Sequence, residues 1–235
     1  MDMKLNCHVY NDIFARPASI VARIVLFVSI FSVWFAFKQP LWTLSFTSNQ
    51  YPDPLRMSIY VNRLEGQKTD LRDDLREINS LNHYIGMKPL APEEFPEFTW
   101  LPFAVGLFVL LILRAVVFGT LRDSIDIAVL YLYFGLYSAW DFYHRLWTYG
   151  HELSPDAPIK VDLFTPPLYG TKQIANFSVD SYPGGGAIAL AVFGALIYLA
   201  LVIAFLTAWL RMRAERRVLR ELKNVKEDYC PESHG

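Results

Sequence analysis

The stretch AIALAVFGALIYLALVIAFLTAWL, from Ala187 to Leu210, decides the class of this protein. It holds no charged residue, and a helix of this length, rising about 1.5 Å per residue, crosses a hydrocarbon layer about 30 Å thick. The whole chain is 53% hydrophobic and 19% charged. This composition is typical of a protein that lipid solvates in part. We therefore predict a membrane-spanning helix over 187–210.

Three further apolar blocks predict three more spans, at 20–37, 100–120 and 125–147. The second is interrupted only by Arg114, whose long side chain can reach the headgroups. The third is the most polar and is expected to face other helices. No cleavage site follows the first, which indicates a retained anchor rather than a secretory signal. The expected fold is an all-α membrane protein built on a four-transmembrane-helix bundle.

Basic residues beside the spans predict the orientation of the chain. They lie before the first span, between the second and third, and after the fourth: Lys4, Arg16, Arg23, Arg122, Arg211, Arg213, Arg216, Arg217 and Arg220. The positive-inside rule then places both termini in the cytoplasm, in a multi-pass protein of the bacterial inner membrane. The remaining segments are a cytoplasmic N-terminus (1–19), two extracytoplasmic segments (38–99 and 148–186) and a charged helical tail (211–235). Cys7 and Cys230 lie near opposite ends and predict no disulfide.

The first outer segment predicts a small α+β cap after the first span. Apolar residues alternate over 55–61, which predicts a strand, and then recur at helical spacing from Leu71 to Leu81. Thr69 or Asp70 is expected to cap this helix and Gly86 to end it. The second outer segment, before the fourth span, is rich in Pro and Gly and is expected to be an ordered lid or a docking surface.

The end of the cap helix carries a candidate metal site. His83 and Met87 are four residues apart, so an imidazole and a thioether can approach one point. This pair suits Cu(I), and Met57 on the neighbouring strand can supply a third ligand. The alternative is that these side chains only pack or cap the helix end.

A resemblance supports the copper interpretation. The run Tyr51–Tyr60 (YPDPLRMSIY), followed by Gly66 and by Leu81–Met87 (LNHYIGM), resembles extracytoplasmic segments of small bacterial membrane proteins linked to copper-enzyme maturation, of the nitrous oxide reductase accessory type. The resemblance covers these segments alone and not the spans. It implies a ligand role for His83, Met87 and, more weakly, Met57.

A second candidate cluster lies at the outer end of the third span. Asp141 and His144 are three residues apart on one helical face, Arg145 follows, and His151 comes after a Tyr-Gly turn. Ionisable residues at a membrane edge are functional candidates, because their burial is costly unless they are paired. Asp141, His144 and His151 can bind a metal or pass protons. The alternative is an interfacial ion pair between Asp141 and Arg145.

The fourth span carries small residues at Ala187, Ala191 and Ala195, which predict close helix packing within the chain, with a homo-oligomer contact as the alternative. The charged tail is expected to lie near anionic lipid, without nucleic acid as a partner.

Motifs for nucleotide, dinucleotide and c-type haem binding, and the nucleophile elbow of hydrolases, are absent from the sequence, so an autonomous enzyme is not expected. Two functional hypotheses follow. One is an accessory protein that binds or relays copper at the outer membrane face. The other is a non-catalytic subunit or scaffold that holds a membrane or periplasmic protein partner. A weaker third is a metal-dependent membrane oxidoreductase subunit.

Overall fold

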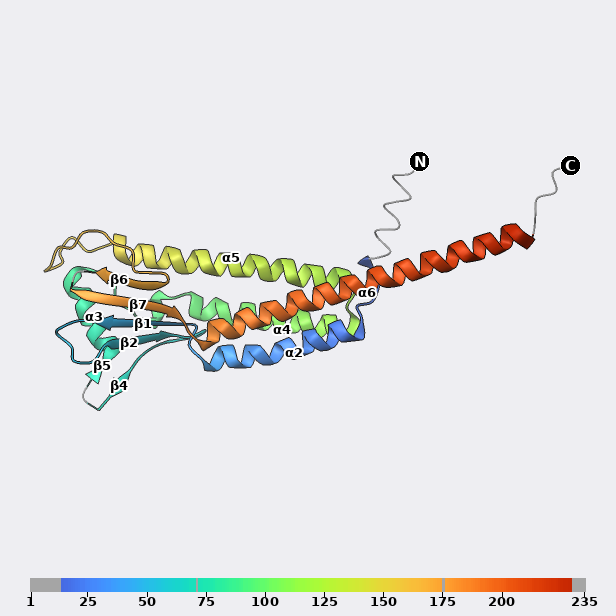
Figure 1. Ribbon diagram of the computed structural model, residues 1–235. Helices are drawn as coiled ribbons and strands as arrows, with labels where there is room; N and C mark the ends of the chain where they lie inside the picture. The colour runs from blue at the N-terminus through green and yellow to red at the C-terminus, as the bar shows by residue number, and fades with distance from the viewer. Residues whose placement is uncertain (1–13, 71, 175, 230–235) are drawn as a thin grey trace.

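The computed structural model describes residues 14–70, 72–174 and 176–229. In this part of the chain, four long helices lie side by side, and a five-stranded antiparallel sheet sits at one end of them (Figure 1). The long helices are α2 (Ile20–Lys38), α4 (Glu97–Phe118), α5 (Leu121–His151) and α6 (Gly185–Tyr229). The far end of α6 extends beyond the other helices, on the side opposite the sheet (Figure 1).

Three of the described helices are long and apolar enough to cross a membrane: α2, α4 and residues Gly185–Leu222 of α6. They indicate a membrane protein. The prediction of four spans is thereby corrected to three. Helix α5 is not among them, because charged residues such as Asp126 and Asp141 and a series of tyrosines lower its hydropathy. It nevertheless runs beside the others and returns the chain to the sheet (Figure 1).

Small residues hold α2 and α6 together. The buried residues repeat at intervals of three and four along both helices: Ala22, Leu26, Ser29, Val33 and Ala36 on α2, and Phe193, Ile197, Ala200, Ala204 and Ala208 on α6. This spacing forms one stripe on each helix and lets the backbones approach closely. The small-residue stripe predicted at Ala187, Ala191 and Ala195 does not form this contact, since Ala191 and Ala195 are exposed.

The sheet joins the two outer segments of the chain and corrects the all-α expectation to a mixed α/β fold. Its strand order is β3-β2-β1-β7-β6. The strands are β1 (Trp42–Thr47), β2 (Leu55–Ile59), β3 (Leu64–Gly66), β6 (Gly170–Ile174) and β7 (Phe177–Pro183). Central strand β1 pairs with β2 on one side and with β7 on the other. The segment expected to be only a Pro/Gly-rich loop therefore supplies a hairpin to the sheet.

The helix that the apolar spacing predicted is α3 (Asp74–Ile85), and it packs against β2. Its N-cap is Asp73, whose carboxylate accepts from the N–H groups of Leu75 and Arg76. Thr69 and Asp70 do not cap it, because β4 (Lys68–Thr69) pairs with β5 (Arg72–Asp73) just before the helix. Gly86 ends α3 with a φ of 79°, as predicted. A short 3-10 helix, η1 (Pro92–Glu94), then leads into α4.

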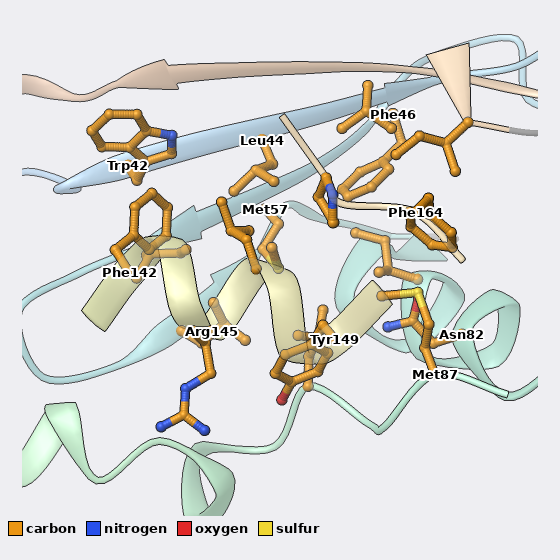
Figure 2. Close-up of a pocket in the computed structure, with 18 of the residues that line it drawn as sticks. Trp42, Leu44, Phe46, Met57, Asn82, Met87, Phe142, Arg145, Tyr149 and Phe164 are labelled. Carbon is orange, nitrogen blue, oxygen red and sulfur yellow. The ribbon is translucent and has the colours of Figure 1, made fainter. Parts of the chain in front are cut away.

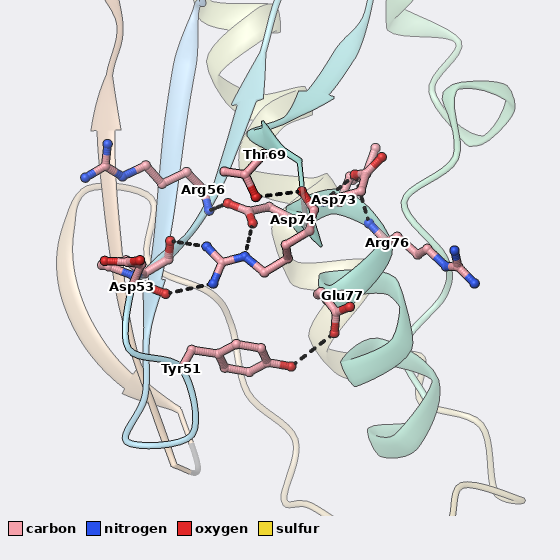
Figure 3. Close-up of polar contacts among 11 residues, drawn as sticks. Tyr51, Asp53, Arg56, Thr69, Asp73, Asp74, Arg76 and Glu77 are labelled. Atoms are coloured by element: carbon pink, nitrogen blue, oxygen red, sulfur yellow. Dashed lines mark hydrogen bonds and ion pairs between the residues drawn. The ribbon is translucent and has the colours of Figure 1, made fainter.

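A buried carboxylate fastens α3 to the sheet (Figure 3). Asp74 is fully buried, accepts from the Arg56 N–H at 2.8 Å and pairs with the Arg72 Nε at 2.7 Å. The Arg72 guanidinium also donates to the carbonyls of Asp53 and Pro54, and Tyr51 donates to Glu77. The polar residues around Tyr51–Tyr60, which carried the copper resemblance, thus hold the helix in place. We call this network the Asp74 clasp.

Candidate ligand cavity between the sheet and the helices

A large apolar cavity separates the sheet from the ends of the helices (Figure 2). Its volume is about 1130 Å³, slightly above the range of about 300–1,000 Å³ that is usual for small-molecule sites. The sheet contributes side chains such as Leu44 and Phe46 to one wall. Phe142 and Tyr149 of α5 lie across from them (Figure 2). Residues of α3, α4 and the start of α6 complete the walls.

The chain between α5 and β6 covers part of this cavity. Val161, Leu163 and Phe164 line it, and Phe164 donates its N–H to the carbonyl of Gly150 at the end of α5. A side chain at Gly150 would meet the Phe164 backbone oxygen at 1.7 Å, so this close crossing requires glycine. The Ile159 N–H donates to the backbone carbonyl of Tyr84 in α3 at 3.0 Å. The predicted outer loop is therefore tied to α3 and α5.

Charged groups from α4 and α5 meet at one part of the lining. Arg145 donates to the Glu97 Oε1 from two nitrogens, at 3.0 and 2.6 Å. The Arg145 guanidinium also lies 5.6 Å from the centre of the Phe95 ring. Asp141 lines the same cavity and lies near both Glu97 and Arg145. The predicted Asp141–Arg145 ion pair is thus replaced by a pair between Arg145 and Glu97, which the sequence reasoning missed.

Three buried polar atoms in the lining lack a hydrogen-bond partner within the described residues: the Asn82 Nδ2, the Glu97 Oε2 and the Ser138 Oγ. Asn82 is 7% exposed, so its amide is cut off from bulk water. Buried polar groups in proteins are nearly always paired, since an unpaired one costs about 1–3 kcal/mol. Their concentration around one cavity indicates positions where a bound molecule completes the hydrogen bonds.

Tyr149 is a neutral donor in this lining. Burial raises the pKa of the Tyr149 phenol to about 12, so it stays protonated at physiological pH. Its hydroxyl donates to the Pro89 carbonyl at 3.3 Å, and its ring stacks on Phe95 at 5.9 Å. Tyr149 therefore fixes the end of α5 against the segment that follows α3.

The residues of the first predicted metal site do not share one environment. Met57 is buried, Met87 is half-buried, and both line the cavity. His83 is exposed and does not belong to the lining. Around Gly86 the chain turns so that the Met87 N–H reaches the Asn82 carbonyl at 2.8 Å. The Met87 side chain then lies beside Asn82 (Figure 2).

The second predicted cluster divides between two faces of α5. His144 stacks on Trp140, with ring centres 5.3 Å apart, and His151 stacks on Trp147 at 4.4 Å. Asp141 instead lines the cavity with Arg145. Among the residues that the structure describes, no group of three or more His, Cys, Asp or Glu side chains is arranged to hold a metal ion. Asp141, His144 and His151 are thus not brought together.

The sequence could have predicted that Asn82 lies on the buried face of its helix. It follows Ile78, on the predicted apolar face of the helix, by four residues, and Asp74 precedes Ile78 by four. These three residues are the buried ones of α3, which places Asn82 rather than His83 on the inner face. No comparable sequence signal marked Ser138, which lies within a long helix.

Comparisons with known proteins add no relative: no protein-family model matches the chain, and neither a curated protein nor a solved structure matches it. The fold and the site define a membrane-associated protein with a sheet-covered apolar cavity.

Proposed function

We propose that this protein binds an apolar, lipid-like molecule in the cavity between its sheet and its helices. The observation that carries this proposal is a space of about 1130 Å³ walled by aromatic and aliphatic side chains at the ends of candidate membrane spans. Burying apolar surface contributes about 25 cal/mol per Å², so a long hydrocarbon chain would gain strongly from this site. The proposed role is to bind this molecule or to pass it to a partner protein, which agrees with the accessory and scaffold hypotheses.

The cavity is proposed to lie at the outer surface of the bacterial inner membrane. The start of α2, the end of α4, the start of α5 and the far part of α6 lie at the end of the bundle opposite the sheet (Figure 1). These segments carry Arg23, Arg114, Arg122 and the arginine-rich stretch beyond Leu210. Arg23 donates to the carbonyls of Val117 and Gly119, where α4 ends. By the positive-inside rule that end faces the cytoplasm and the sheet faces the periplasm. Both termini then lie in the cytoplasm, because α5 runs beside the three apolar helices and returns the chain to the sheet before α6 (Figure 1).

The test is to identify the lipids that co-purify with the protein from membranes. We expect organic extraction and mass spectrometry to recover a lipid near one equivalent from the native chain. Ile59→Trp, which adds bulk to a half-buried lining residue, should lower that amount severalfold. The matched control is Leu136→Trp at an outward-facing, 63% exposed residue of α5. Equal lipid content in the native chain and both variants would contradict the proposal.

Copper binding stays a second candidate, favoured by one observation: the thioethers of Met57 and Met87 line the same cavity. Thioethers are ligands that suit Cu(I). An anaerobic Cu(I) titration should show one strong site that Met57→Leu and Met87→Leu each abolish, whereas His83→Ala tests whether the exposed imidazole takes part. If all three variants bind copper as the native chain does, these residues are not the ligands. A metal-free chain that purifies in fixed ratio with another subunit would favour the scaffold hypothesis.

A further inference from the structure

We infer that the molecule bound in the cavity is an uncharged amphiphile that carries a hydroxyl and a carbonyl group, as a monoacylglycerol does. The inference rests on the proposed function and names the class of ligand. It follows from the three unpartnered polar atoms of the lining and from the charges that surround them.

The Glu97 Oε2 and the Ser138 Oγ are both suited to a hydroxyl on the ligand, because a carboxylate oxygen accepts and a serine hydroxyl can accept or donate. Arg145 already occupies the other Glu97 oxygen, Oε1, through two N–H groups. A carboxylate oxygen only accepts, so Oε2 takes a donor from a ligand hydroxyl or from the Asp141 carboxyl, which shares a hydrogen bond with Glu97. Asp141, which lies beside Glu97, adds a second carboxyl group to this part of the lining. A ligand hydroxyl satisfies these acceptors without bringing charge.

The Asn82 Nδ2 calls for an acceptor at a separate point. An amide nitrogen only donates, and Asn82 is 93% buried, since 7% of it is exposed. In Figure 2, Tyr149 lies between Asn82 and Arg145, so the two polar points are spaced along the cavity. A carbonyl oxygen is a suitable partner for Asn82. An ester that joins a hydroxyl-bearing head to an apolar chain offers both groups.

The charges of the described lining disfavour an anionic head group. Three acidic residues, Glu97, Asp141 and Asp162, line the cavity against two basic ones, Arg145 and Lys160. Arg145, the cation that lies beside Glu97 and Asp141, is already paired with Glu97. A carboxylate or phosphate placed beside these two acids would lose its hydration without gaining an unpaired cation there. The charges around Glu97 therefore disfavour the head groups of fatty acids and phospholipids at this point of the lining.

Three probes with the same chain test the inference: 1-monooleoylglycerol has a carbonyl and hydroxyls, methyl oleate has only the carbonyl, and oleate is anionic. Native mass spectrometry of the full chain, in detergent with equal amounts of the three, gives the relative occupancy. We expect monooleoylglycerol to exceed methyl oleate by about three- to tenfold, the effect of one or two hydrogen bonds. Oleate should bind least.

Two conservative variants separate binding from folding. Ser138→Ala removes one unpartnered hydroxyl and should reduce the preference for monooleoylglycerol over methyl oleate about threefold. Asn82→Asp replaces the donor by an acceptor of the same shape and should weaken both esters. Preference for oleate, or equal occupancy by all three probes, would overturn this inference while the proposed function stands. Failure of every probe to bind the native chain would overturn the proposed function itself.

Discussion

The helix bundle and the sheet-covered cavity are both apolar, but the bundle is closely packed and the cavity is open. Along α2 and α6, alanines such as Ala22, Ala36 and Ala200 are completely buried and close the space between the helices. Between the sheet and the helix ends, large side chains such as Phe46 and Phe142 leave about 1130 Å³ open. The stripes on α2 and α6 lie along each other, so their small side chains fit together without a gap. The face of the sheet instead meets the ends of several helices, and its side chains do not fill the space between them. Packing here distinguishes a structural region from a binding region.

Their polar groups differ in the same way. In the bundle, the Tyr131 hydroxyl donates to the Leu190 carbonyl at 2.6 Å, and the Tyr198 hydroxyl donates to the Ala128 carbonyl at 3.1 Å. These two bonds join α5 and α6 in both directions. In the cavity lining, Asn82, Glu97 and Ser138 each keep an atom without a partner among the described residues. The two tyrosines complete their hydrogen bonds within the bundle, whereas the cavity lining leaves these three atoms to a ligand.

The largest expected effect comes from the Asp74 clasp, which fastens α3 to the sheet. Asp74→Ala should destabilise the sheet and α3 by about 3–5 kcal/mol, because it leaves the Arg72 charge and the Arg56 N–H without their acceptor. Hydrogen exchange of the β2 and α3 amides measures the loss. Glu77→Gln, at the edge of the same network, is the control and should cost much less. Equal protection in the Asp74→Ala chain would show that the clasp does not hold α3.

The next largest effect tests how closely α5 and α6 pack in the bundle. Gly194→Val should destabilise the contact of α5 with α6 by about 1–3 kcal/mol, since a Cβ there would lie 2.2 Å from the Tyr131 ring. Thermal unfolding in detergent measures it. Ala195→Val is the matched control at the neighbouring, exposed position and should change stability by less than about 0.5 kcal/mol. Equal effects at both positions would contradict the assigned face of α6.

A pair of hydroxyl deletions tests the polar contrast directly. Tyr131→Phe should cost about 0.5–1.5 kcal/mol, because it leaves the Leu190 carbonyl without its tyrosine donor. Ser138→Ala should leave stability unchanged or raise it, because its hydroxyl loses no bond within the described residues. The free energies of unfolding of the two variants, measured in the same detergent, decide the point. A larger loss for Ser138→Ala would reverse the comparison.

The smallest effect concerns the surface link between the segment after α3 and the end of α5. The hydrogen bond and charge of Lys88 lower the pKa of Glu152 below its ordinary value of about 4.5. The contribution of this pair is therefore complete above that value and is lost as the pH falls through the lowered folded pKa. Lys88→Met should flatten the pH dependence of stability in that acidic window only. An unchanged profile would show that the exposed pair contributes nothing measurable.

The sequence predicted the parts of the fold that depend on local patterns. Apolar runs located α2, α4 and the membrane part of α6, and alternation located β2, because these signals lie within one element. The pairing of β1 with β7 brings Trp42 beside Pro183, and no local pattern encodes contact at that separation. The same limit hid the site: Glu97 and Arg145 belong to different helices, and their pairing depends on how α4 and α5 meet.

The central claim is that the cavity holds an apolar ligand, and photo-crosslinking tests it most directly. The full chain is irradiated with a monooleoylglycerol that carries a diazirine in its acyl chain, and the labelled residues are mapped by mass spectrometry. We predict adducts on Leu44, Phe142 and Phe164 that excess unlabelled monooleoylglycerol removes. Adducts confined to outward-facing residues such as Phe31 and Leu136, and insensitive to the competitor, would contradict the account.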